Sequence, residues 1–265
     1  MPLTSITLDD LTIQDEASFA HVAVYGQLKR ALRRAQVRFQ VPAKGSQLSW
    51  DRAAFLNLTF WSAEEGADVL CEASIPADVV AHVAWHHLAS QQLAQIAPGS
   101  PSAAALFFGE SIASAFDLYL VGRLLPNAPD SDFIETQVSI MGDAAEEAGL
   151  ERDDFAALLD GVVADPERAF EELRGLLFDV SRALFACRGA PEAQLVFERF
   201  EAHRFASLLH HFQLSNWVLY ARAYATAAPE QERAVLELDA TLRAAPTALD
   251  WLIEHWVESP LQKRV

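Results

Sequence analysis

The sequence of 265 residues contains only two cysteines, Cys71 and Cys187. Neither belongs to a CxxC pair or lies near a histidine cluster in the sequence, so nothing predicts a disulfide framework or a thiolate metal site. The simplest setting for such a chain is a reducing, cytoplasmic one. The first residues lack both a basic segment and a continuous apolar stretch, so we expect no signal peptide.

Long uncharged segments and basic side chains are also scarce. No span of 20 residues is free of charged or strongly polar groups, which predicts no membrane partner. The chain has 20 basic against 37 acidic side chains and a formal net charge of −17. A surface of this sign repels phosphate backbones, so nucleic acid is not an expected partner. The expected partner is therefore a protein or a small molecule.

The patterning that is present is helical almost throughout. Half of the residues are apolar, enough for a sizeable core. We therefore predict an all-α, bundle-like protein in which residues 3–13 form a short strand or an extended arm. The expected helices cover 15–39, 49–62, 76–95, 102–125, 131–147, 152–163, 166–186, 191–226, 229–244 and 247–257. Prolines and glycines separate them, and Ser100 and Ser102 are placed to cap the fourth.

The best candidate for a domain boundary is the segment 126–132, Pro-Asn-Ala-Pro-Asp-Ser-Asp. It divides an amino-terminal helical layer, residues 1–125, from a carboxy-terminal one, residues 126–265. A single domain over 1–265 is the alternative.

Two neighbouring predicted helices carry the groups that suggest chemistry. His82 and His86 are four residues apart, about 40° round a helix, and Glu110 and Asp117 are seven apart, about 20°. Both pairs lie on otherwise apolar faces. A carboxylate among apolar groups needs a partner, and no basic residue shares the face of Glu110 and Asp117. The short connection through 98–101 favours antiparallel packing that brings imidazoles against carboxylates.

This arrangement resembles the gluzincin zinc peptidases. Their HExxH helix supplies two histidine ligands, and a glutamate ligand follows on a later helix. The resemblance covers residues 78–121 and implies that His82, His86 and Glu110 bind zinc or another divalent metal. It also implies that Asp78 or Asp117 orients a ligand histidine.

The sequence departs from that family at the residue after the first histidine. The family has a glutamate there, the general base for the metal-bound water, whereas this chain has Val83. Valine cannot accept a proton, so conventional peptide hydrolysis is excluded. A site with two histidines, one carboxylate and open positions also suits iron(II), so the ion is left open.

Two other interpretations stay open. The histidines and carboxylates can satisfy one another as a structural cluster in a non-enzymatic interaction or regulatory protein. A helical-bundle non-haem iron protein is the third interpretation, although Glu201 and His203 lack the ExxH spacing of such bundles.

A second histidine pair falls within the expected helix 191–226. His203 and His210 are seven residues apart and share one face of that helix. They are candidates for a further ligand, a proton donor or a substrate contact, with a packed core role as the alternative. His87 points about 140° away from His82 and is expected to be exposed.

Overall fold

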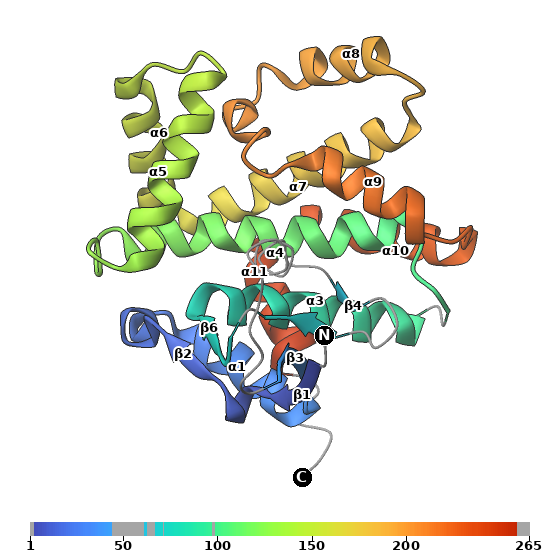
Figure 1. Cartoon of the computed structure of the whole chain (residues 1–265). Helices are drawn as coiled ribbons and strands as arrows, with labels where there is room; N and C mark the ends of the chain where they lie inside the picture. Colours follow the sequence, from blue (N-terminus) through green and yellow to red (C-terminus); the bar gives the residue numbers. More distant parts are fainter. Residues whose placement is uncertain (1–2, 44–60, 63–66, 71, 97–98, 259–265) are drawn as a thin grey trace. The chain divides into compact units, whose positions relative to one another are not determined.

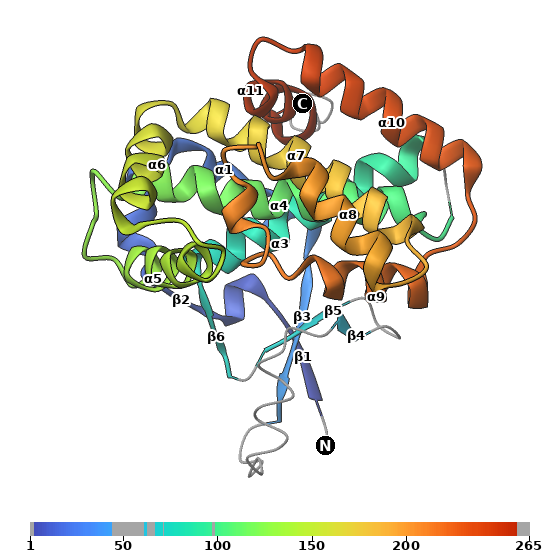
Figure 2. The same cartoon turned by 90° about the horizontal axis from the view of Figure 1, so that it is seen from above.

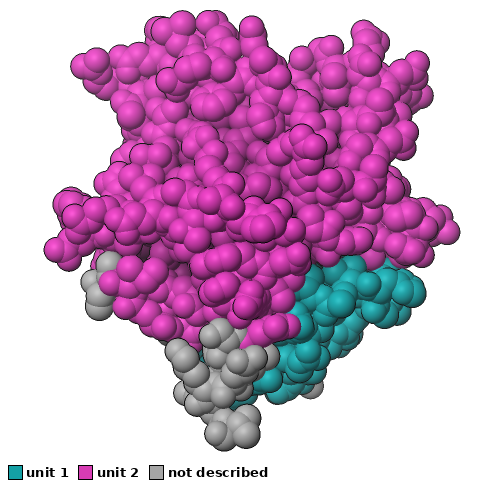
Figure 3. Space-filling model, turned by 180° about the vertical axis from the view of Figure 1, so that it is seen from behind, with its two compact units in different colours: residues 1–84 teal, residues 85–265 magenta. Residues whose placement is uncertain are grey.

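The structure is a computed structural model that describes residues 3–43, 61–62, 67–70, 72–96 and 99–258. The chain divides into two compact units, residues 1–84 and 85–265 (Figure 3). The division falls inside one continuous helix, α3 (Ala77–Ile96). The predicted boundary at 126–132 lies within the second unit, between two of its helices.

The first unit contains short strands in two ladders. The larger sheet has the order β1-β3-β5-β4, and its long strands β1 and β3 pair antiparallel and lie side by side in Figure 2. The smaller ladder pairs β2 with β6 in parallel. The strands are β1 (Leu3–Thr7), β2 (Thr12–Gln14), β3 (Arg38–Pro42), β4 (Trp61–Ser62), β5 (Ala67–Val69) and β6 (Ser74–Pro76).

The helical part of the first unit is shorter than predicted. Residues 15–39, expected as one helix, form a 3₁₀ turn η2 (Glu16–His21), helix α1 (Ala23–Ala35) and the start of β3. Helix α1 ends because Gln36 takes a left-handed conformation with φ of 52°. The expected helix 49–62 lies outside the described residues except for its last two, which belong to β4.

The segment 3–13 is confirmed as extended. It forms β1, a 3₁₀ turn η1 (Leu8–Asp10) and the beginning of β2. The small sheet that β1 joins was not predicted, because its other strands are two to five residues long and carry too little pattern to be recognised singly.

The second unit is helical and confirms the all-α fold class. After α3 come α4 (Ala103–Leu124), α5 (Asp132–Glu147), α6 (Arg152–Ala164), α7 (Pro166–Ala186), α8 (Ala190–Phe200), a 3₁₀ turn η3 (Ala206–Leu208), α9 (Leu214–Tyr224), α10 (Pro229–Ala244), α11 (Ala248–Leu252) and a π-helical turn η4 (Ile253–Glu258). Side-chain oxygens cap three of the helices: Ser102 accepts from Ala105 N–H, and Ser131 and Asp165 cap α5 and α7.

Helix α4 forms the centre of the second unit. Most of its residues are buried, and it lies along α7 while α5, α6, α9 and α10 also contact it (Figure 1). Among the described residues it is the one helix long and apolar enough to cross a membrane by length and composition. However, 83% of its most apolar window is buried inside the protein, as in the core helix of a soluble protein.

A buried arginine joins this core to its neighbours. The side chain of Arg174 on α7 is fully buried and lies over the ring of Phe108, 5.8 Å from the ring centre. Its Nη1 donates to Asp239 on α10 at 2.8 Å, and its Nη2 donates to Glu171 at 2.8 Å. Two carboxylates therefore compensate the buried charge.

The prediction of one long helix over residues 191–226 is wrong. Helix α8 ends at Phe200, residues 201–213 form turns, and α9 begins at Leu214 after Gln213, whose φ is 49°. The apolar spacing of Phe205, Leu208 and Phe212 suggested a helix, but successive 3₁₀ turns also bury side chains three or four residues apart.

Helix α4 approaches α6 and the start of α7 closely at Gly122. A Cβ atom at this position would lie 2.8 Å from the carbonyl oxygen of Val162 and 3.0 Å from Cβ of Pro166. We predict that Gly122→Ala lowers the free energy of unfolding by about 1–3 kcal/mol in urea titrations, because backbone atoms cannot move aside easily.

Gly26→Ala in α1 is the control for this prediction. Its Cβ would meet only the flexible end of Arg30 at 3.6 Å, so it should be neutral or stabilise by up to about 1 kcal/mol through higher helix propensity. Equal effects of the two substitutions would contradict the close packing at Gly122.

Candidate metal centre

Helices α3 and α4 pack antiparallel, as the sequence predicts. Trp85 on α3 meets Phe116 on α4 edge to face at 5.5 Å, whereas His86 and Ala89 lie near Gly109. Residue numbers therefore rise along one helix as they fall along the other. Gly109 lies at this contact: a Cβ atom there would lie 3.6 Å from Cβ of Ala89 and 3.8 Å from His86 Nδ1, at ordinary van der Waals distance.

The structure brings His82, His86 and Glu110 together. Each offers one ligand atom, and these three atoms lie within 4.8 Å of one another. His86 Nε2 lies 3.5 Å from Glu110 Oε2. Among the residues that the structure describes, this is the one group of three histidine, cysteine or carboxylate side chains that could hold a metal ion.

The donor set fits a small divalent ion. Metal–ligand bonds of about 2.0–2.1 Å in a tetrahedral site place neighbouring donors about 3.3 Å apart. The distance of 3.5 Å between His86 and Glu110 is close to such an edge. The outer limit of 4.8 Å for the group exceeds it, so small side-chain rotations would complete the coordination.

The group is more open to solvent than the apolar faces suggested. The side chain of His86 is 19% exposed, that of Glu110 is 31% exposed, and His82 is also only half-buried. The three side chains are therefore not enclosed in an apolar interior. Partial exposure gives an ion a route from solvent and leaves space for a water or a substrate in a remaining coordination position.

No protein-family model matches this chain, and no curated protein or solved structure matches it. The interpretation of the site consequently depends on its own geometry.

Val83, which occupies the position of the peptidase base, is buried and apolar. The two acids expected to orient the histidines lie near other groups. The charge of Asp117 acts on His211, and that of Asp78 acts on Tyr25 in α1. Neither acid belongs to the group of three, and their orienting role stays a prediction.

The second pair of histidines does not lie on one helix face. His203 follows the end of α8 and lines a separate pocket, whereas His210 is exposed and stacks on Phe197 with ring centres 5.5 Å apart. Neither belongs to the candidate metal group. Their predicted alignment fails because the chain turns repeatedly between α8 and α9.

The expectation for His87 is also wrong. The side chain is half-buried, and burial lowers the pKa of His87 below its ordinary value. The opposite side of α3 is covered as well, so a residue can point away from the metal group without reaching open solvent.

Sequence reasoning missed Tyr220 on α9. Burial raises the pKa of the Tyr220 phenol, and the charges of Tyr224 and Glu110 raise it further. A phenol thus lies within electrostatic reach of a candidate ligand. Since 110 residues separate the two positions, only the packing of α9 against α4 brings this about.

The burial of His211 leads us to expect a lower free energy of unfolding in acid. Burial lowers the pKa of His211, although the charge of Asp117 opposes the shift, and its buried Nδ1 has no hydrogen-bond partner among the described residues. Near pH 6.5 the unfolded chain takes up a proton that the folded ring does not. The free energy of unfolding should therefore fall as the pH drops below about 7, by at most about 1.4 kcal/mol per pH unit for this group.

The measurement is urea unfolding between pH 7 and pH 5 in the presence of a chelator. His211→Gln removes the titrating ring and should make the pH dependence less steep than in the unmodified protein. Equal slopes for the two proteins would contradict the role of the buried ring.

Proposed function

We propose that this protein binds one divalent metal ion through His82, His86 and Glu110. The observation that carries the proposal is the convergence of two imidazoles and one carboxylate within 4.8 Å on two antiparallel helices. The carboxylate comes from α4 and both histidines come from α3, and the 31% exposure of the Glu110 side chain leaves it accessible to an ion from solvent.

The proposed ion is zinc or another divalent metal that prefers the same ligands. Two imidazoles and one carboxylate are the protein ligands of many catalytic zinc sites, and the same set with open positions suits iron(II). The partial exposure of His86 and Glu110 supports an accessible coordination position rather than a closed structural site.

We propose that the protein is similar to the gluzincins but lacks the glutamate that acts as their general base. A bound zinc ion would polarise a carbonyl or lower the pKa of a bound water. With Val83 in the place of the glutamate, this chain offers no proton acceptor at that position. We therefore expect no conventional peptidase activity. The partner is a small molecule or a protein, and the low cysteine content favours a cytoplasmic location.

Metal titration tests the proposal directly. Protein stripped with a chelator should bind about one equivalent of Zn²⁺ or Co²⁺ in calorimetry, and native protein should contain metal by mass spectrometry. Free metal at about 100 times its dissociation constant should stabilise the fold by about 2.7 kcal/mol, seen as a higher melting temperature.

Variants identify the ligands. His82→Ala and Glu110→Ala should each weaken binding by more than the roughly 10–100-fold that loss of an outer hydrogen-bond partner costs. His87→Ala on the same helix is the matched control, because His87 is outside the group of three, and it should retain binding.

The structural alternative makes the opposite prediction. The separation of 3.5 Å between His86 and Glu110 also permits direct pairing without metal. A native protein that holds no metal and does not bind Zn²⁺, Co²⁺ or Fe²⁺ would overturn the proposal. It would leave a helical interaction protein with a structural His–carboxylate cluster.

A further inference from the structure

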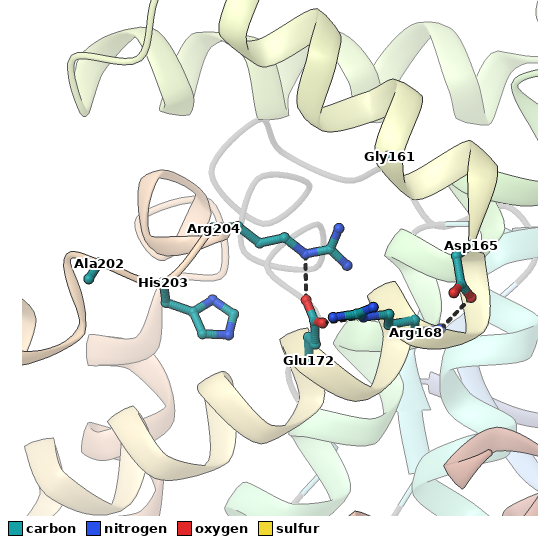
Figure 4. A pocket seen from close by; sticks show the side chains of 7 residues that line it. All are labelled: Gly161, Asp165, Arg168, Glu172, Ala202, His203 and Arg204. Atoms are coloured by element: carbon teal, nitrogen blue, oxygen red, sulfur yellow. Dashed lines mark hydrogen bonds and ion pairs between the residues drawn. The ribbon is translucent and has the colours of Figure 1, made fainter. Parts of the chain in front are cut away.

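A pocket in the second unit presents hydrogen-bond donors that the metal proposal does not use. It has a volume of about 660 Å³, is open to solvent, and lies between the end of α6, the start of α7 and the turn at 202–204 (Figure 4). Pockets of about 300–1,000 Å³ are typical of small-molecule sites. Its polar wall consists of Arg168, Glu172, His203 and Arg204, with Asp165 at the rim.

The two arginines share one carboxylate through their inner nitrogens. Arg168 Nε donates to Glu172 Oε1 at 2.7 Å, and Arg204 Nε lies 2.5 Å from Glu172 Oε2. Among the described residues, the terminal nitrogens of both guanidinium groups have no hydrogen-bond partner. Each guanidinium carries several donors in a planar fork that matches a carboxylate or a phosphate. The shared carboxylate holds both forks at the pocket.

Gly161 lies beside one of these forks: a Cβ atom there would lie 3.6 Å from Arg204 Nη1, at ordinary contact distance. The Arg204 guanidinium lies over the ring of Phe205, 4.3 Å from its centre. This stacking restricts the guanidinium and lowers the entropy that a ligand would have to remove.

His203 adds a third donor. Burial lowers the pKa of the His203 ring, the charge of Arg204 lowers it further, and the charge of Glu172 opposes both. The ring is therefore mainly neutral at pH 7. Its Nδ1 accepts from the Phe205 N–H at 3.2 Å, so the neutral ring carries its proton on Nε2. Figure 4 shows the side chains of His203 and Arg204 extending from the same turn toward Glu172.

We propose that this pocket binds a small organic anion through its carboxylate or phosphate group, which receives hydrogen bonds from Arg168, Arg204 and His203. The formal charges of the two arginines, Glu172 and Asp165 cancel. Recognition therefore depends on directed donors rather than on an excess of positive charge, which is consistent with a protein whose net charge is −17. Asp165 caps α7 by accepting from the Arg168 N–H, where the helix dipole offsets its charge.

The opposing interpretation is that the arginines only connect α7 to the turn at 202–204. The two interpretations differ in what Glu172 does. A purely structural Glu172 would stabilise the fold and have no effect on ligands. In the proposed site it competes with the ligand for both guanidinium groups, so its neutralisation should strengthen anion binding.

The experiment is calorimetric titration of the full chain with inorganic phosphate and, separately, with succinate, each at constant ionic strength set by NaCl. We expect saturable binding of at least one of them at millimolar concentration or below. Tighter binding of phosphate indicates a phosphorylated ligand, and tighter binding of succinate indicates a carboxylic acid. Glu172→Gln should bind the preferred anion at least threefold more tightly than the unmodified protein.

Arginine variants locate the binding. Arg204→Met and Arg168→Met should each weaken binding at least tenfold, whereas Arg204→Lys, which keeps the charge but not the fork, should weaken it less. Arg233→Met changes an exposed arginine on α10 and should bind like the unmodified protein. Near-UV circular dichroism establishes that each variant is folded. Absence of saturable binding, or equal binding by the Arg204→Met and Arg233→Met proteins, would overturn the proposal.

Discussion

The burial of helix α4 is the constraint on which the second unit depends. Apolar residues occur on every face of this 22-residue helix, so the chain must surround it rather than cover one stripe. Helix α7 packs along α4, and α5, α6, α9 and α10 also contact α4. The few ionisable groups on such a helix have to find partners. Glu110 meets His86, and Arg174 from α7 lies over Phe108 with two carboxylates of its own.

The parts of the structure that the sequence predicted are those determined by neighbouring residues. The bounds of α4, α7 and α10 follow from capping side chains and from prolines in the first turn. The convergence of His82, His86 and Glu110 was predictable because a short connection joins their two helices, which leaves antiparallel packing as the simple arrangement.

The parts that escaped prediction depend on contacts between distant residues. The turns between α8 and α9 follow the same apolar spacing as a helix, so periodicity does not distinguish them. Short strands such as β5 and β6 become recognisable only through their pairing. Tyr220 reaches Glu110, and Arg204 reaches Glu172, through packing across 110 and 32 residues of chain. No local pattern contains that information.

The residue at position 109 bears on which ion the proposed site would select. Gly109 lies beside Ala89 and His86 of α3, and a Cβ atom there would touch both at ordinary contact distance. The distance between the two helix backbones sets how far apart the donors of α3 and α4 lie, so it would favour one ionic radius and coordination geometry as much as the chemical identity of the donors would. Selectivity among ions of different size can therefore change through a residue that never touches the ion, while all three ligands stay the same.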